Sequence, residues 1–210
     1  MCVQFMIRKS LRELGEVFHA RIEGEFEFAA RVFPRYVAPV LGMSDGVRVI
    51  KPYQFGLIPP FERNLKPKLI LHNARVETLH EKPSFRDAFP KQRCLIPLES
   101  FFEYLSIGSE GRGLYRIQPE HGGLLVAAGL FTRWKSPDGK LIPTFTMITR
   151  PAPEELVRAG HDRCPYFLDP KGYDDWLQGK GASPSEWYEV LRQGRFEPKL
   201  VWERFSSESV

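Results

Sequence analysis

The sequence contains few cysteines and no long apolar run. The three cysteines, Cys2, Cys94 and Cys164, are an odd number at wide spacing, which does not make a disulfide framework. No stretch approaches the roughly 18 consecutive apolar residues of a membrane span. The first residues also lack the basic-then-apolar order of a signal peptide. We therefore expect a cytoplasmic protein that does not enter a membrane.

Charge of one sign is not in large excess either. Lysine and arginine total 30 against 26 acidic residues, which gives a net charge of +4 and a pI near 9.0. This balance is compatible with an anionic partner, although many cytosolic proteins are equally basic. A hydrophobic fraction of 42% is enough for a core, while 18 prolines and 17 glycines imply many turns. That composition argues against a helical bundle.

Many short apolar segments separated by turn residues predict an α+β fold with a mostly antiparallel, barrel-like sheet and a few peripheral helices. We expect one domain over residues 1–210 with a frayed tail from about 206. Strands are predicted at 47–51, 93–98, 144–149 and 198–205, and 114–118 and 124–131 are predicted as an antiparallel pair. A hairpin turn is predicted at 137–140 and a loop at 161–165. Helices are predicted after the capping box of Ser10 and Glu13, from Ser84 to about Phe89, from Pro153 to Gly160, and over 174–177 and 184–191.

The segment 72–104 is the densest in side chains that can do chemistry. Asn73, Arg75 and Glu77 alternate, so on an extended backbone they would share one face. The amide of Asn73, the planar guanidinium of Arg75 and the carboxylate of Glu77 could together bind and orient a polar ligand. The plainer interpretation is a surface ladder of arginine and glutamate.

Glu103 lies between Phe102 and Tyr104. A carboxylate among aromatic rings is desolvated, which favours its protonated form and suits proton transfer near neutral pH. The alternative is an ordinary glutamate at the end of a strand.

Cys2 follows the initiator methionine. Because its side chain is small, we expect methionine aminopeptidase to remove Met1 and to leave an amine and a thiol on adjacent carbons. Such a 1,2-aminothiol captures aldehydes, first as an imine and then as a five-membered thiazolidine. An α-amine has a pKa of about 7.7–8.0, against about 10.4 for lysine, so much of it is nucleophilic at neutral pH. The alternative is an incidental cysteine beside a start codon.

His161 follows a helix-ending glycine and precedes Arg163 by two residues. A histidine can carry protons and an arginine can hold a phosphate, although a loop histidine can also simply pack against a carbonyl. His161 and Cys164 could begin a zinc site with Cys2 and Cys94, but no closely spaced cysteine pair supports one. We expect no metal and no cofactor. Most of the aromatic residues should be core, while one or two at a loop could stack on nucleic-acid bases.

Taken together, these segments resemble the SRAP family, the SOS response-associated peptidases. The matching segments occur in the family's order and span nearly the whole chain. They are Met1-Cys2, Arg35-Tyr36 with Ala38-Pro39, Phe55-Gly56-Leu57-Ile58-Pro59, Asn73-Ala74-Arg75 with Glu77-Thr78, Lys82-Pro83-Ser84-Phe85-Arg86, Arg93-Cys94-Leu95-Ile96-Pro97, Phe102-Glu103-Tyr104, Ala128-Gly129-Leu130-Phe131 with Trp134, and His161-Asp162-Arg163-Cys164-Pro165.

The resemblance implies a protein that binds single-stranded DNA and crosslinks covalently to abasic sites, shielding the lesion in the DNA damage response. It implies Cys2 as the nucleophile, Asn73 as the residue that orients it, Glu103 as acid and base, and His161 as the partner near the opened sugar. Arg75 and Arg163 would hold phosphates. The predicted DNA contacts are completed by Phe55, Tyr104 and Arg86.

The resemblance also implies self-processing that removes Met1, possible lyase chemistry, a monomer, and association with the nucleoid when bound to DNA. Two alternatives stay open: a thiol peptidase that uses Cys2 with His161 and Glu103, and a non-covalent single-stranded DNA-binding module. The chain departs from the family at Val3-Gln4, where Gly-Arg is usual. It departs again at five other positions, which are Val37 for asparagine, Phe55, Phe61 and Tyr104 for tryptophan, and Cys164 for methionine.

Overall fold

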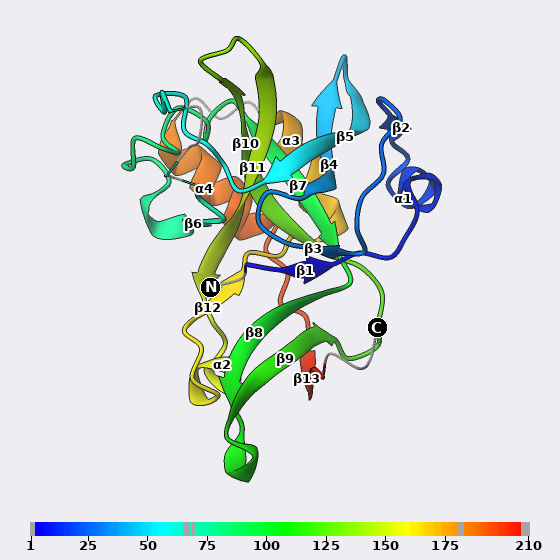
Figure 1. The fold of residues 1–210 in the computed structure, drawn as a ribbon, viewed down its shortest axis with the longest axis vertical. Coiled ribbons are helices and arrows are strands. Elements are labelled where there is room, and N and C mark those ends of the chain that lie inside the picture. The colour runs from blue at the N-terminus through cyan, green and yellow to red at the C-terminus, as the bar shows by residue number, and fades with distance from the viewer. Residues whose placement is uncertain (1–2, 65–67, 69, 180–182, 207–210) are drawn as a thin grey trace.

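The computed structural model describes residues 3–64, 68, 70–179 and 183–206. They form two sheets, a barrel in the upper part of Figure 1 and a smaller sheet beneath it. The smaller sheet has five strands in the order β13-β9-β8-β1-β3. Their bounds are β1 Phe5–Met6, β3 Arg31–Val32, β8 Ser100–Ser106, β9 Arg112–Pro119 and β13 Leu200–Arg204.

The larger sheet follows the order β12-β11-β10-β7-β4-β5-β2, and β6 pairs with β11. Strand β11 also pairs in parallel with β5, through Thr144 with Gln54 and Phe145 with Phe55, so β11, β10, β7, β4 and β5 close into a barrel. This confirms the predicted α+β fold with a barrel-like core. The strand bounds are β2 Arg21–Ile22, β4 Val37–Ser44, β5 Val47–Phe55, β6 Asn73–Arg75, β7 Arg93–Leu98, β10 Leu125–Lys135, β11 Leu141–Pro151 and β12 Arg163–Pro165.

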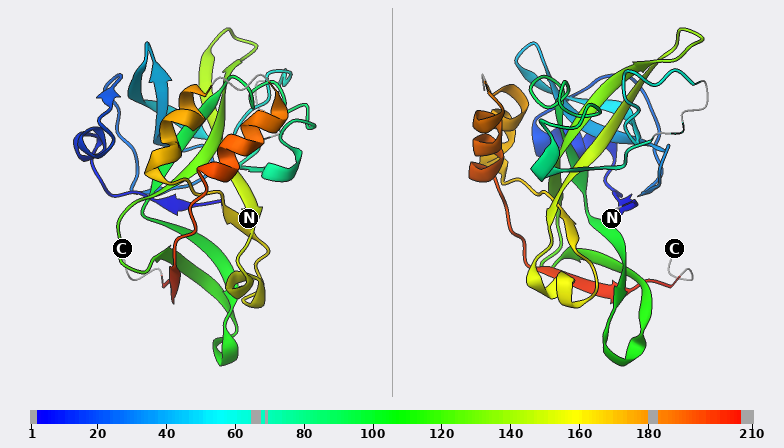
Figure 2. Two further views of the ribbon diagram at one scale, coloured as in Figure 1. Left: turned by 180° about the vertical axis from the view of Figure 1, so that it is seen from behind. Right: turned by 90° about the vertical axis from the view of Figure 1, so that its left-hand side faces the viewer.

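The helices are short and lie at the periphery. Figure 2 shows α3 and α4 together on one face of the barrel. The capping box predicted at Ser10 and Glu13 is present at the start of α1. No helix in the described part of the chain has the length and apolar character needed to cross a bilayer. The helices are α1 Leu11–Phe18, α2 Glu154–Arg158, α3 Tyr173–Gln178 and α4 Pro184–Gln193, with 3₁₀ turns η1 Val76–Thr78, η2 Gly108–Glu110 and η3 Pro170–Gly172.

The barrel interior is filled by aromatic and branched side chains. The ring of Phe55 stacks on Phe145 with centroids 5.2 Å apart, and Phe5 meets Phe55 edge-on at 5.3 Å. Gly129 on β10 is required by this packing, because a Cβ there would come within 2.7 Å of the Ile96 side chain and 2.9 Å of a main-chain oxygen. Through the contact of Phe5 with Phe55, the core also joins the N-terminal strand β1 to the barrel.

Two predicted features near the middle of the chain are wrong. Residues 84–89 form a series of turns instead of an α-helix, with Phe85 and Arg86 both donating to the carbonyl of Lys82. A segment this short between Pro83 and Pro90 cannot repay the cost of starting a helix.

The predicted pairing of 114–118 with 124–131 is also wrong, although both strands exist. Strand β9 pairs with β8 and β13, whereas β10 pairs with β7 and β11. The turn that contains Gly122 and Gly123 therefore carries the chain from one sheet to the other. The hairpin predicted at 137–140 is confirmed between β10 and β11. The segment predicted as a loop at 161–165 instead supplies the short strand β12.

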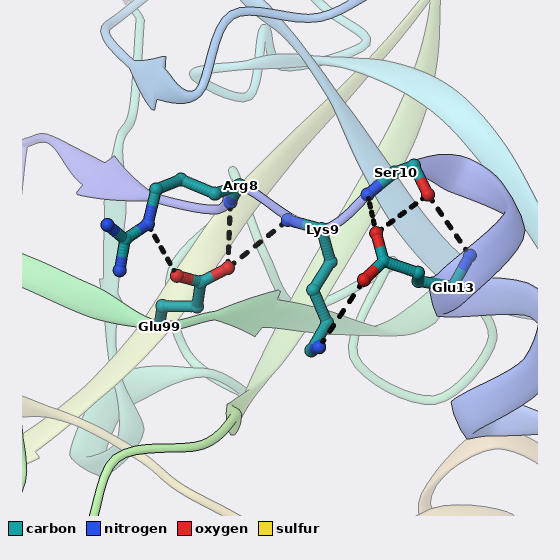
Figure 3. A network of polar contacts seen from close by, with 5 residues as sticks. All are labelled: Arg8, Lys9, Ser10, Glu13 and Glu99. Atoms are coloured by element: carbon teal, nitrogen blue, oxygen red, sulfur yellow. Dashed lines mark hydrogen bonds and ion pairs between the residues drawn. The ribbon is translucent and has the colours of Figure 1, made fainter.

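The N-terminal strand lies inside the smaller sheet, between β8 and β3 (Figure 1). Just beyond it, Glu99 holds the chain, as Figure 3 shows: the main-chain N–H groups of Arg8 and Lys9 donate to its Oε1 at 2.8 and 3.2 Å. The Nε of Arg8 donates to Oε2 at 2.9 Å. Burial alone would raise the pKa of Glu99, but these hydrogen bonds outweigh it and hold the pKa below its usual value.

We expect Glu99→Gln to lower the free energy of unfolding by about 1–2 kcal/mol at pH 7, because a charged acceptor is lost. A depressed pKa stabilises the fold above the unfolded pKa of about 4.3 and loses that effect as pH falls through the lower folded value. The deficit, measured by urea denaturation, should therefore shrink below pH 4.5. Glu16→Gln, in an exposed pair with Arg12, is the control and should cost less than about 0.5 kcal/mol. An equal deficit at pH 7 and pH 4 would contradict the assignment.

Candidate active site

Glu103 lies on β8 with its side chain turned inward. The residue is 5% exposed, whereas its neighbour Tyr104 is 56% exposed, because successive side chains on a strand point to opposite faces. The pairing of Glu103 with Tyr115 on β9 fixes its register. The predicted desolvated setting of this carboxylate is thus present.

His161 comes from the turn that follows α2. Gly160 has a φ of +85°, which glycine adopts without strain, and it lets the main-chain N–H of His161 donate to Leu156 at 2.9 Å. The N–H of Ser106, at the end of β8, donates to the carbonyl of Ala159 at 2.8 Å. This bond attaches the turn to the strand that carries Glu103.

As a result, His161 Nε2 lies 3.0 Å from Glu103 Oε1, and both side chains are at most 10% exposed. A carboxylate and an imidazole at hydrogen-bonding distance can pass a proton between them and to a third group. Their partial shielding from water strengthens each interaction. The arrangement is compatible with the acid–base role predicted for Glu103.

Asn73 and Arg75 lie on β6, which runs parallel to β11 with Asn73 beside Met147 and Arg75 beside Thr149. Ala74 between them is buried, while Arg75 is exposed. The Oδ1 of Asn73 is shielded from solvent. The shared face predicted for three residues holds for these two only, because the chain leaves the strand and Glu77 lies in the 3₁₀ turn η1.

Arg163 on β12 is paired with Glu77. Its Nη1 and Nη2 donate to the two carboxylate oxygens at 2.7 and 3.0 Å, and Nη2 also donates to the carbonyl of Thr149 at 2.8 Å. Desolvation opposes ionisation of Glu77, but these contacts keep its pKa below the usual value. The pair ties β12 to η1 across β11. A phosphate contact by Arg163 would have to replace Glu77.

The remaining predicted DNA contacts differ in exposure. Phe55 has no exposed surface, so its ring cannot stack on a base in this structure, and we remove it from the proposed contact set. Tyr104 and Arg86 are exposed. The guanidinium of Arg112, which the sequence analysis did not select, lies 5.7 Å from the centre of the Tyr104 ring. No sequence pattern marked Arg112, because its contact with Tyr104 depends on the pairing of β8 with β9.

Cys2, the predicted nucleophile, lies outside the described residues. The β1–β8 register pairs Phe5 with Phe101, and the N–H of Phe102 donates to the carbonyl of Gln4 at 3.1 Å. Continued by two residues beyond Phe5, this register sets Val3 opposite Glu103.

The two other cysteines are poor candidates for a nucleophile. Both are buried and free. Burial raises the pKa of the Cys164 thiol to about 12 and raises that of Cys94 as well. A thiol that does not ionise near neutral pH is a weak nucleophile and a weak metal ligand.

Three comparisons place the chain among known proteins. The sequence profile of the family described as "SOS response associated peptidase (SRAP)" matches residues 1–208. "Abasic site processing protein YoqW" of Bacillus subtilis is 32% identical over 196 residues, 91% of this chain and 87% of that protein. "Abasic site processing protein YobE" of the same organism is 33% identical over 188 residues, 88% and 85% of the two chains. An X-ray structure of a Bordetella bronchiseptica protein matches with a TM-score of 0.79 and 26% identity, covering 98% of this chain and all of that one.

We expect Arg163→Lys to lower the free energy of unfolding by about 1–2 kcal/mol, because a lysine cannot reproduce the two-nitrogen contact with Glu77. Urea denaturation at pH 7 measures the change. Arg158→Lys is the matched control, since Arg158 pairs with Glu154 on the exposed face of α2, and it should cost less than about 0.5 kcal/mol. Equal effects of the two substitutions would show that the two-nitrogen contact of Arg163 with Glu77 contributes no more than an exposed pair.

Proposed function

Because the chain belongs to the SOS response associated peptidase (SRAP) family, we propose that it processes abasic sites in DNA by bonding covalently to them through Cys2. The relatives that match most of its length carry the name abasic site processing protein. The observation that carries the proposal is the buried contact of Glu103 with His161, on the strand β8 that pairs with β1, which begins three residues after Cys2. Arg75 and Tyr104 are exposed and offer a cation and an aromatic surface to a nucleic acid.

The proposed reaction needs an aldehyde, an amine and a thiol. With Met1 removed, the α-amine of Cys2 adds to the aldehyde of the opened sugar and gives a carbinolamine. Loss of water gives an imine, and the Cys2 sulfur then bonds to the imine carbon while its proton moves to the nitrogen. The product is a thiazolidine, and water is the only molecule released. No metal or redox partner is required.

We assign each step of this reaction to a side chain at the site. Loss of water from the carbinolamine needs a proton donor, which is the role we assign to Glu103, with His161 as its partner near the sugar. Asn73 positions the nucleophile, and Arg75 holds a flanking phosphate. Tyr104, with Arg112 beside it, offers a face on which an unpaired base can stack, which favours single-stranded DNA. Arg86 supplies a further cation along the strand.

The rest of the proposal follows from this chemistry. The adduct would shield the lesion during the response to DNA damage, with the protein cytoplasmic and bound to the nucleoid DNA as a monomer. Removal of Met1 by the chain itself, and strand cleavage by a lyase step through the imine, are further proposed activities of the same site. A thiol peptidase acting on other proteins and a purely non-covalent DNA-binding module remain the rivals.

We expect the wild-type protein to form a heat-stable adduct with abasic single-stranded DNA on a denaturing gel. Cys2→Ser and Cys2→Ala keep the amine but lack a ring-closing thiolate, so their adducts should be hydrolysable imines that survive only after borohydride reduction. A variant that retains Met1 should form no heat-stable adduct, because the Cys2 nitrogen is then an amide and cannot close the thiazolidine.

An undamaged oligonucleotide of the same sequence is the control and should bind reversibly with a strong salt dependence. A stable adduct of undiminished yield with Cys2→Ala would contradict the thiazolidine mechanism. Binding without any adduct would favour the non-covalent module, and efficient cleavage of unrelated peptides would favour the peptidase.

We expect Glu103→Gln to slow adduct formation or its reversal by about 10²–10⁴-fold, which is the usual contribution of a positioned proton donor. Affinity for undamaged single-stranded DNA should stay nearly unchanged. His161→Ala and Asn73→Ala should also be slower, with the same chemical product. If Glu103→Gln unfolds the protein or abolishes DNA binding, the role of Glu103 is structural.

A further inference from the structure

Arg31 on β3 is enclosed by three aromatic rings. Its Cζ lies 5.0 Å from the centre of the Phe33 ring and 4.5 Å from the centres of the rings of Phe102 and Phe205. These rings come from the segment after β3, from β8 and from the end of the described chain. Phe102 and Phe205 also contact each other, edge to face at 5.0 Å. The guanidinium is therefore held in place by packing from three separate segments.

The edge of the guanidinium that the rings leave open is used by Gln4. The Nε and Nη2 of Arg31 both donate to Gln4 Oε1, at 3.1 and 2.7 Å. No carboxylate among the described residues lies within ion-pair distance of Arg31. Desolvation lowers the pKa of Arg31, which is the sign of a charge withdrawn from water. The planar guanidinium donates two N–H groups to Gln4 in a fixed direction, which the single ammonium of a lysine cannot do.

Gln4 is thereby held by its main chain and by its side chain. Its carbonyl accepts from the N–H of Phe102 at 3.1 Å, and its side chain accepts from Arg31. Phe102 takes part in both contacts, since its ring packs on Arg31, and the next residue on the same strand is Glu103. Gln4 follows Cys2 by two residues, a reach of about 7 Å at most.

We propose that Arg31 is a positioning residue, which acts through Gln4 to hold the N-terminal segment so that Cys2 meets the acid–base pair of Glu103 and His161. The proposal rests on the proposed function and adds to it a residue that touches neither the DNA nor the reacting atoms. It also gives a role to the segment just after β13, because Phe205 supplies one ring of the enclosure. The main-chain N–H of Phe205 donates to Leu114 at 2.8 Å, which anchors that ring on β9.

The test measures three quantities for each variant. They are the rate constant of adduct formation at saturating protein, the dissociation constant for undamaged single-stranded DNA, and the hydrogen–deuterium exchange of the amides of residues 4–7. The variants are Arg31→Ala, Arg31→Lys, Gln4→Ala and the double variant Arg31→Ala with Gln4→Ala. Arg192→Ala is the charge-matched control, since Arg192 pairs with Glu189 on the surface of α4.

We expect Arg31→Ala to slow adduct formation by about 10- to 100-fold, because a small misplacement of a reacting group has an effect of that size. The dissociation constant should stay within about twofold, and exchange at residues 4–7 should rise. Gln4→Ala should be slowed similarly, and the double variant should be no slower than the slower single one, because both act through one contact. Arg31→Lys keeps the charge but should not restore the rate. Arg192→Ala should match the wild type in all three quantities.

Other outcomes would overturn the proposal. An unchanged rate and unchanged exchange in Arg31→Ala would mean that Arg31 does not hold the segment. A loss confined to the dissociation constant, restored by Arg31→Lys, would identify Arg31 as a direct phosphate contact. Independent, additive effects of Arg31→Ala and Gln4→Ala would separate the two residues. If the wild type itself forms no adduct, the proposed function fails, and the exchange measurement still decides whether Arg31 anchors residues 4–7.

Discussion

The site depends on the pairing of a two-residue strand, β1, with β8. Because β1 lies between β8 and β3, its main chain is held from both sides, and its register with β8 determines which residue lies opposite Glu103. The chain is held again just after the strand, where the carboxylate of Glu99 accepts hydrogen bonds from the main-chain N–H groups of Arg8 and Lys9. A strand this short has little stability of its own. Its position is therefore set by its main-chain pairing with β8 and β3 and by the contacts of Glu99.

The barrel supplies the frame that carries the other predicted site residues. Strand β11 pairs with β6, which carries Asn73 and Arg75, and with β12, which carries Arg163. The ion pair of Arg163 with Glu77 then joins β12 to η1. The turn after α2 is fastened to β8 by the bond from Ser106 to Ala159, which brings His161 to Glu103. Groups far apart in the sequence are thus fixed by main-chain bonds at short range.

The sequence was most informative where one local pattern decides the outcome. The capping box at Ser10, the hairpin at 137–140 and the fully buried strand Arg93–Leu98 follow from turn chemistry and hydrophobic content alone. The paired roles of Glu103 and His161 came from the resemblance, since no pattern in either segment marks the other. What failed was decided by tertiary partners. Both β9 and β10 were predicted, yet each pairs with strands distant in sequence.

The failures at the site have the same cause. Phe55 was predicted as a DNA contact, but the closure of β5 on β11 puts its ring in the core. Glu77 was placed on the face of Asn73 and Arg75 by its alternation, but the chain turns at Val76. The enclosure of Arg31 by Phe33, Phe102 and Phe205 joins segments about 70 and 100 residues apart, which no local window in the sequence reveals.

The central claim is that the covalent bond to the abasic DNA forms at Cys2. The most direct test is to incubate the wild-type protein with an abasic single-stranded oligonucleotide, digest the adduct with trypsin and nuclease, and locate the remaining sugar by mass spectrometry. The account predicts a remnant at Cys2 on the N-terminal peptide, with the mass of that peptide and the remnant less one water, and with no free thiol on that peptide. A remnant on a lysine, or on a peptide that still begins with Met1, would contradict it.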